Sequence, residues 1–322
     1  MKKKKKKKKK TTKHNVDTIR VASIVSYPIK SCGGIQLKRT RLTKTGIEGD
    51  RMWMFVDEKG RFVSQRKYPR MALIRPEIMR DGETNMISGV TLKAGTITKL
   101  IVPITKKRSR RVTVWGTLVS AYDQGDKAAS WIDRMLCTKG LRLVFLGEEP
   151  RPVGDDEKYA LTPAYDQVSF SDGYPLLLIS EESLSELNRR LGKKKAVPMN
   201  RFRPNITVRG VDSPHAEDRW QEFQIGPAVM SGVKKCQRCR IPTTDQDTGV
   251  QAGFEGEPLK TLRTYRCGTS ESTRKGVFFG QNVIHHRNHI SWLRSFFVNE
   301  AFPMISVGDP VVVKKIGNVP ES

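Results

Sequence analysis

Short segments rich in valine and isoleucine, separated by turn-forming residues, recur through the first half of this 322-residue chain. Segments of this length and spacing are typical of a β-barrel or β-sandwich, because each strand crosses its sheet once before the chain turns back. The first half is therefore predicted to be mostly β. The predicted strands cover residues 18–27, 52–56, 86–92, 100–104 and 111–115.

Two helices are predicted among further strands. Apolar residues recur at helical spacing from 128 to 136, ahead of an apolar strand at 141–146. The second helix begins after Ser180, a suitable N-cap, carries an acidic first turn, and ends at Gly192. Its buried face is expected to consist of Leu184, Leu187 and Leu191. Further strands are predicted at 175–179, 205–208, 305–307 and 311–313.

The chain carries a formal net charge of +26, and nine of its lysines form the uninterrupted run at residues 2–10. Such a run repels itself and buries nothing, so residues 1–16 are predicted to be a disordered arm that can touch an anionic membrane. The rest of the chain is also basic, which favours a polyanionic ligand. Nucleic acid is a weaker candidate, because aromatic residues make up only 7% of the chain and no recognition motif is present.

Membrane insertion and secretion are not expected from this sequence. It contains no run of about 18 apolar residues, which a membrane-spanning helix needs. Its five cysteines are sparse and odd in number, unlike the framework of a disulfide-rich secreted protein. We therefore expect a soluble protein in a reducing compartment such as the cytoplasm; association with mitochondria is added as an alternative only by the family resemblance given below.

Two of the cysteines, Cys236 and Cys239, lie within a run that also holds four basic residues. Nearby positive charge favours thiolate over thiol, and a thiolate can bind a soft metal, exchange disulfides or attack an electrophile. Zinc would need further ligands, for which the histidines at 285, 286 and 289 are candidates, the first and last having the spacing of residues that share a helix face. A thioredoxin-like dithiol or an inert buried thiol beside an exposed one also remains open.

Three other basic motifs are candidates for binding an anion. Arg201 and Arg203 flank Phe202 ahead of a strand, where their guanidinium groups can hold phosphate or carboxylate. Lys30-Ser31 precedes a pair of glycines, a combination that can cradle an anion, although it lacks the order of a P-loop. Arg51 follows a turn immediately before a strand. Each motif alone is also compatible with a solvated basic loop or a surface salt bridge.

Taken together, the motifs resemble the MOSC-domain family, and within it the amidoxime-reducing components and their bacterial relatives. The resemblance covers nearly all of residues 18–314. It rests on the ordered segments 27–34, 49–53, 175–184, 201–205, 236–239 with 245–249, and 307–311. It implies an α+β, mostly β protein with an N-terminal MOSC-associated β-barrel-like domain and a C-terminal MOSC β-barrel domain.

The resemblance also implies a molybdenum cofactor in the cleft between these domains. Cys239 matches the family's metal ligand, which makes it the predicted catalytic and metal-binding residue. The predicted cofactor-binding residues are Lys30, Ser31, Arg51, Arg203, Gln237 and Arg238. Two positions depart from the animal members, which carry serine in place of Tyr174 and of Gln237.

The reaction implied by the resemblance is two-electron reduction of an N-hydroxylated compound to the amine or amidine. The chain has no dinucleotide-binding motif, so its electrons are expected to come from another protein. The resemblance implies that a cytochrome b5 and its NADH-dependent reductase supply them. Residues 106–111 are a candidate docking site for such an acidic carrier. The alternative is a sulfur or molybdenum-cofactor carrier without turnover.

The proline-containing, acidic stretch at 148–159 is the most linker-like part of the sequence. We therefore predict an N-terminal domain at 17–147, a MOSC domain at 148–315 and a flexible C-terminus at 316–322.

Overall fold

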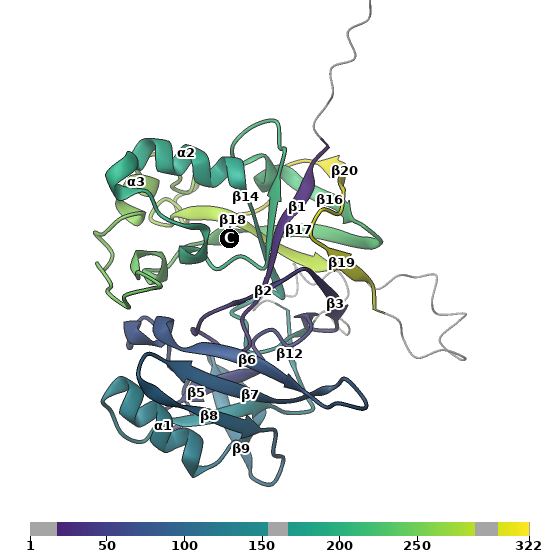
Figure 1. Cartoon of the computed structure of the whole chain (residues 1–322). Helices are drawn as coiled ribbons and strands as arrows, with labels where there is room; N and C mark the ends of the chain where they lie inside the picture. The colour runs from purple at the N-terminus through teal and green to yellow at the C-terminus, as the bar shows by residue number, and fades with distance from the viewer. Residues whose placement is uncertain (1–17, 154–166, 287–301, 322) are drawn as a thin grey trace, which may run out of the picture.

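The computed structural model describes residues 18–153, 167–286 and 302–321. Its strands form two β-rich parts, one above the other in Figure 1. The upper part holds most of the second half of the chain, and the lower part holds most of the first half. The fold is mostly β, which confirms the predicted fold class.

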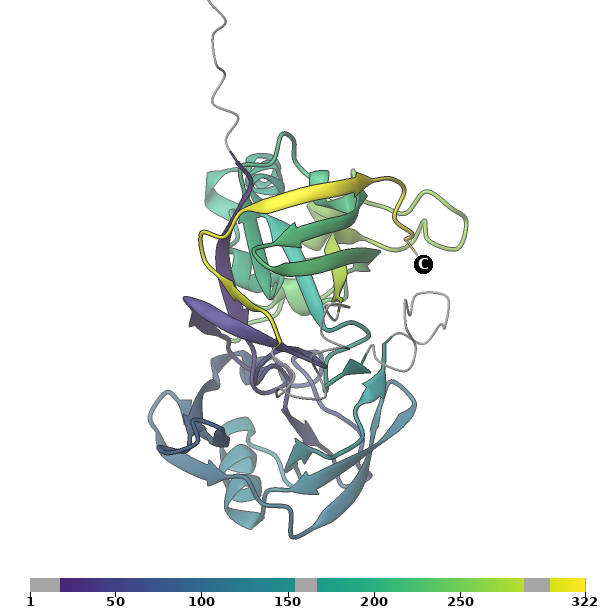
Figure 2. The same ribbon diagram turned by 90° about the vertical axis from the view of Figure 1, so that its right-hand side faces the viewer.

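The upper part is built on one sheet of eight strands. In spatial order these are β2 (Ile35–Leu37), β1 (Arg20–Ser26), β15 (Ile206–Arg209), β14 (Leu176–Ser180), β18 (Phe278–His285), β17 (Ala228–Gln237), β16 (Trp220–Ile225) and β20 (Val311–Ile316). The N-terminal strand β1 therefore lies inside the C-terminal sheet, antiparallel to β15. Figure 2 shows this sheet curving around its apolar interior, which includes Ile24, Ile206 and Phe223.

Two helices cover one side of this sheet, α2 (Glu181–Leu191) and α3 (Leu259–Arg263). The N-cap of α2 forms as predicted, because the Ser180 hydroxyl accepts a hydrogen bond from the Ser183 backbone N–H at 3.1 Å. Leu187 and Leu191 are buried, and Leu184 is partly buried against the same cluster.

The lower part contains two smaller sheets and one helix. The first sheet has the order β5 (Trp53–Val56), β11 (Arg142–Leu146), β10 (Thr117–Asp123) and β9 (Ser109–Val114), and the second has the order β6 (Arg75–Arg80), β7 (Ile87–Ala94) and β8 (Ile97–Pro103). Helix α1 (Asp126–Leu136) buries Trp131 and Ile132 among the apolar side chains of these sheets. Short pairs join β12 (Arg151–Pro152) to β13 (Gln167–Val168), and β3 (Arg39–Thr43) to β4 (Gly46–Ile47) and β19 (Met304–Ser306).

Every predicted strand and both predicted helices are confirmed to within a few residues. The prediction omitted α3 and the strands β2, β3, β4, β6, β10, β12, β13, β16, β17 and β18. The most consequential omission is β17, whose last residues are lysines, a cysteine and a glutamine, a polar composition that hid the strand. The predicted domain boundaries remain a prediction, and the second half of the linker-like stretch, residues 154–159, lies outside the described residues. No helix in the described ranges is long and apolar enough to cross a membrane.

A buried pair of amides ties the two parts together. Gln65 and Gln246 each donate to the other's side-chain oxygen, at 3.1 and 3.0 Å. The Gln65 amide also donates to the Ser31 carbonyl at 2.9 Å. Both side chains are buried, so these donors and acceptors depend on one another rather than on water.

The first prediction concerns this pair. Replacing Gln65 with alanine leaves the Gln246 side-chain oxygen and the Ser31 carbonyl without their donor, so the free energy of unfolding should fall by about 1–3 kcal/mol. Urea unfolding of Gln65→Ala, Gln246→Ala and the double variant should give a coupling energy of at least about 0.5 kcal/mol. Gln36→Ala, at an exposed glutamine, is the control and should leave stability unchanged. Strictly additive effects would contradict the pairing.

Candidate functional site

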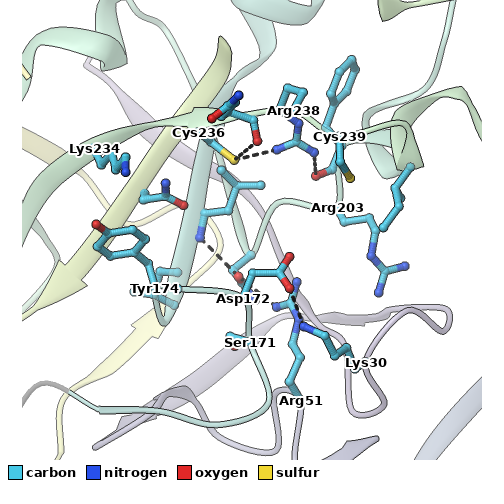
Figure 3. Close-up of a pocket in the computed structure, with 18 of the residues that line it drawn as sticks. Lys30, Arg51, Ser171, Asp172, Tyr174, Arg203, Lys234, Cys236, Arg238 and Cys239 are labelled. Carbon is cyan, nitrogen blue, oxygen red and sulfur yellow. Dashed lines mark hydrogen bonds and ion pairs between the residues drawn. The ribbon is translucent and has the colours of Figure 1, made fainter. Parts of the chain in front are cut away.

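A cavity of about 430 Å³ lies where the two parts meet. Segments far apart in the sequence form its wall, from the loop after β1 to the end of β17 (Figure 3). All seven predicted site residues line this cavity, namely Lys30, Ser31, Arg51, Arg203, Gln237, Arg238 and Cys239. The structure therefore brings together residues that the sequence separates by up to 209 positions, although their roles stay predictions.

The cavity wall is strongly cationic. Asp172 is the one acidic side chain among its described residues. Its basic side chains are Lys30, Arg51, Arg66, Arg203, Lys234, Lys235 and Arg238. This excess of positive charge over negative charge favours an anionic ligand.

Lys30 reaches the cavity from the loop after β1 and is almost fully buried. Its ammonium lies 2.5 Å from Asp172 Oδ1 and 2.8 Å from the Phe170 carbonyl. Burial lowers the pKa of Lys30, and Asp172 opposes that shift. The pKa of Asp172 is lowered as well: burial acts to raise it, but Lys30 and the Trp115 indole N–H hold it well below the ordinary value. Asp172 is therefore ionised at neutral pH.

Arg51 is fixed by the fully buried carboxylate of Asp50. Its Nη1 lies 2.5 Å from Asp50 Oδ2 and 3.0 Å from the Asn205 side-chain oxygen. Asp50 Oδ1 accepts further hydrogen bonds from the Tyr27 backbone N–H at 2.7 Å and the Asn205 amide at 3.1 Å. The alternative of a surface salt bridge is wrong, because the Arg51–Asp50 pair is internal.

Arg203 follows Phe202, a fully buried side chain that packs on Phe279 with ring centroids 4.3 Å apart. The Arg203 guanidinium lies 4.3 Å from the centre of the Tyr27 ring. Burial lowers the pKa of Arg203 to about 10, so it remains a cation at neutral pH. Its neighbour Arg201 instead pairs with Asp245 at 2.7 Å. The alternative of a solvated basic loop is therefore wrong, and of the two arginines only Arg203 lines the cavity.

Backbone strain is concentrated at this cavity. Within the described residues, seven non-glycine residues have positive φ, and four of them line the cavity wall. These four are Ser31 at 66°, Arg51 at 48°, Trp115 at 51° and Arg203 at 58°. Because side chains other than glycine are disfavoured there, such residues cluster where the surrounding structure fixes a functional geometry.

The two cysteines lie at and just beyond the end of β17. Irregular pairing with β18 between Gly232 and Lys234, and again between Lys235 and Gln237, twists the strand on the approach to the cavity. Arg238 donates to Cys236 Sγ at 3.0 Å, as Figure 3 shows. It also donates to the Phe202 carbonyl at 2.7 Å. Both thiols are half-buried, and both face the cavity.

The expected thiolate at Cys236 is wrong. Burial raises the pKa of Cys236, and the Arg238 charge opposes that shift without reversing it. A positively charged sequence neighbourhood favours a thiolate only if its charges stay close and the thiol stays hydrated. Here Lys235 is paired with Glu321 at 3.0 Å, and the effect of burial on the Cys236 thiol outweighs the charge of Arg238.

The zinc and dithiol alternatives have little support in this geometry. His285 is the last residue of β18, so the prediction that it lies on a helix is wrong. It pairs with Met230, which lies at the opposite end of β17 from Cys236. Position 289 lies outside the described residues. Within the described ranges, no three His, Cys, Asp or Glu side chains gather to hold a metal. The cysteine pair is followed by a single 3-10 turn, Ile241–Thr243, and not by the α-helix of a thioredoxin-like motif.

Two parts of the sequence match known protein families, and these matches identify the family of the chain. Residues 18–139 match the MOSC N-terminal beta barrel domain, and residues 165–312 match the MOSC domain. The chain belongs to the MOSC-domain family. The predicted family resemblance is therefore confirmed.

Curated relatives in this MOSC-domain family include two amidoxime-reducing components. The chain is 36% identical to mitochondrial amidoxime-reducing component 1 of Homo sapiens, over 90% of this chain and 82% of the relative. It is 32% identical to mitochondrial amidoxime reducing component 2 of Bos taurus, with the same two coverages. It is also 32% identical to the molybdenum cofactor sulfurase of Oryza sativa subsp. japonica, over 78% of this chain but 31% of that longer protein.

The cavity residues that escaped the sequence prediction include three with large polar or charged side chains, Arg66, Trp115 and Asp172. Arg66 and Asp172 stand among many charged residues with no distinguishing pattern around them. Trp115 gave one usable signal, because it precedes a glycine between two strand-like segments, where asparagine or aspartate is the usual residue.

The second prediction follows from the raised pKa of Cys236. A higher thiol pKa means less thiolate at neutral pH, so alkylation of Cys236 in the cofactor-free protein should become half-maximal above about pH 8.5, the ordinary thiol value. Mass spectrometry of iodoacetamide-labelled peptides across pH 6–11 measures this, with exposed Cys137 as the internal reference. A midpoint below that of Cys137 would restore the thiolate interpretation.

Proposed function

We propose that this MOSC-domain protein is a molybdenum-cofactor oxidoreductase that reduces N-hydroxylated compounds to amines or amidines. The observation that carries the proposal is the meeting of two thiols and an excess of fixed cations in one cavity between the two parts. The names of the amidoxime-reducing relatives supply the reaction. The name of the sulfurase supplies the cofactor.

The residues present fit such a cofactor. In the described part of the chain, Arg203 Nη2 and Arg238 Nε are buried donors without a hydrogen-bond partner. A buried cationic donor of this kind is costly unless an anion or another acceptor meets it. The phosphate and ring oxygens of a pterin supply such acceptors, and a soft thiol donor suits molybdenum.

In this proposal, Lys30, Ser31, Arg51 and Arg203 hold the phosphate and pterin, while Gln237 and Arg238 line the site. Cys239 provides the protein's sulfur ligand to the metal. The bound cofactor supplies two-electron chemistry in which the hydroxyl oxygen leaves as water.

Asp172 has the geometry to orient a substrate. Its Oδ1 is occupied by Lys30 at 2.5 Å and by the Trp115 indole N–H at 2.9 Å. In the described residues Oδ2 accepts no hydrogen bond, and 67% of the side chain is exposed toward the cavity. As an ionised acceptor, Oδ2 can take a hydrogen bond from the N–H or O–H of an N-hydroxylated amidine and hold that group in place.

The third prediction separates the two thiols. Cys239→Ser should lose bound molybdenum and at least 95% of benzamidoxime reduction, because a serine hydroxyl is a poor ligand for a soft metal. Cys236→Ser should keep most of both, since its sulfur bonds only within the cavity wall. Molybdenum is measured by elemental analysis, and turnover with reduced cytochrome b5. Equal loss in both variants would falsify the single-ligand assignment.

The electron donor proposed for this protein is a cytochrome b5, reduced in turn by its NADH-dependent reductase. The docking site proposed at residues 106–111 lies at the start of β9, whose other end reaches the cavity through the β9–β10 hairpin. Lys106 is paired with Glu148 at 2.5 Å, and Arg110 lies 3.6 Å from Asp123. The exposed side chains Lys107 and Arg111 therefore supply most of its uncompensated charge.

The fourth prediction tests this docking site. Lys107→Gln/Arg111→Gln should raise the KM for cytochrome b5 several-fold and weaken its dependence on ionic strength, while turnover with dithionite stays unchanged. Lys194→Gln/Lys195→Gln removes the same charge from an exposed turn at the end of α2 and serves as the control. No change in the KM for cytochrome b5 in the first variant would remove the assignment.

A carrier of sulfur or of the molybdenum cofactor, without turnover, is the second candidate. It is favoured by the presence of a second thiol, Cys236, in the same cavity, and by the sulfurase among the relatives. Sustained reduction of benzamidoxime, with many turnovers per bound molybdenum, excludes this alternative. A protein that keeps its cofactor but does not turn over supports it.

A further inference from the structure

Trp115 occupies an unusual place in the lower part of the fold. Strands β9 and β10 pair directly from Val114 to Thr117, so their connection is the two-residue loop Trp115-Gly116. Both loop residues have positive φ, 51° and 87°, as in a type I′ turn. Asparagine or aspartate favours the first position of that turn, whereas a bulky aromatic residue there is strained.

The strained loop directs the Trp115 side chain to the cavity. Its indole N–H donates to Asp172 Oδ1 at 2.9 Å, and its ring lies 5.1 Å from that of Phe62. Even so, 45% of the residue is exposed. A large exposed aromatic surface on a cavity wall is suited to cover a planar ligand.

Arg66 stands beside this tryptophan. The centre of its guanidinium lies 4.4 Å from the centre of the Trp115 ring, and its Nε donates to Ser64 Oγ at 3.3 Å. Stacking occupies the flat face of a guanidinium and leaves the N–H groups at its edge free to bind. In the described part of the chain, Nη1 and Nη2 of Arg66 have no hydrogen-bond partner.

The charge of Arg66 is surplus to the cavity's internal pairing. Lys30 has Asp172, Arg51 has Asp50, and Lys235 has Glu321 as direct carboxylate partners. Asp172 is the one carboxylate among the described residues of the cavity wall, yet it is already bound by Lys30 and by the indole N–H of Trp115. Arg66 also lies outside the residues assigned to the cofactor.

We propose that Arg66 and Trp115 together form a substrate-recognition site that selects planar N-hydroxylated compounds bearing a carboxylate. The two Nη groups of Arg66 bind the carboxylate through paired hydrogen bonds, and the exposed indole covers the planar body. Asp172 repels the same carboxylate, so the ligand enters with its N-hydroxyl end toward the cysteines. This inference rests on the proposed function.

The experiment compares benzamidoxime with 4-carboxybenzamidoxime, which differ only in the carboxylate. For the carboxylated compound, Arg66→Gln should raise both the dissociation constant and the KM about 10-fold or more. For benzamidoxime, the same variant should change each of these constants less than about threefold. Lys67→Gln removes one charge from the adjacent, exposed residue and should affect neither compound. Arg66→Lys keeps the positive charge but lacks the two parallel N–H donors of a guanidinium. It should therefore retain only part of the preference for the carboxylated compound.

Trp115→Asn separates recognition from folding. Asparagine followed by glycine is a favoured two-residue hairpin loop, so the thermal midpoint should stay the same or rise. The affinity for both compounds should nevertheless fall about fivefold or more, because the planar cover is gone. An unchanged affinity would show that Trp115 serves only the turn, and would overturn its part in the proposal.

Isothermal titration of the holoprotein measures affinity without turnover, alongside molybdenum and pterin content. If Arg66→Gln loses the cofactor, Arg66 is a cofactor ligand and the proposal is overturned. Equal weakening of both compounds by Arg66→Gln also overturns it. If neither compound is reduced, but the wild-type protein binds the carboxylated one more tightly and Arg66→Gln abolishes that difference, the recognition site stands and the proposed reaction fails.

Discussion

The buried carboxylate of Asp50 is the interaction on which the cavity depends most. It accepts hydrogen bonds from the Tyr27 backbone, the Arg51 guanidinium and the Asn205 amide, three groups that come from both halves of the chain. Burial raises the pKa of this carboxyl, and the Arg51 charge and these hydrogen bonds oppose the shift. Removing one partner of such a buried pair typically costs about 3–5 kcal/mol. The same contacts therefore hold the fold together and place Arg51 in the cavity wall.

The cavity tolerates its positive charge because different cations are compensated in different ways. Lys30 and Arg51 have carboxylate partners, whereas Arg203 lies against the face of Tyr27 and keeps one buried nitrogen without a partner in the described residues. A stacked guanidinium retains its charge and its edge donors, so it is prepared to meet an anion. The unpaired buried donor therefore lowers the stability of the folded protein until a ligand binds and supplies the missing acceptor.

The sequence predicted the local elements well because their signals are local. An N-cap serine, an acidic first turn and spaced leucines were enough to place α2. The C-terminal end of β17 was not predictable in this way, since Lys234, Lys235 and Gln237 there pair with β18, a strand more than 40 residues later. The seven predicted site residues came from motif order, whereas Asp172 and Arg66 could be found only once the sheet topology had brought them beside Lys30 and Trp115.

Strain and function coincide at this cavity because of the path of the chain. Strand β1 belongs to the upper sheet, but the loop after it is tied to the lower part, where the Lys30 and Trp53 backbone N–H groups bond to Trp53 and Pro28 carbonyls at 2.9 and 3.0 Å. The chain must therefore turn sharply as it crosses between the parts, and Ser31 and Arg51 adopt positive φ at those crossings. Each such residue costs of order 1–3 kcal/mol, which the surrounding hydrogen bonds offset. Since neither part alone supplies both sides of the crossing, the cavity can assemble only when the two parts fold together.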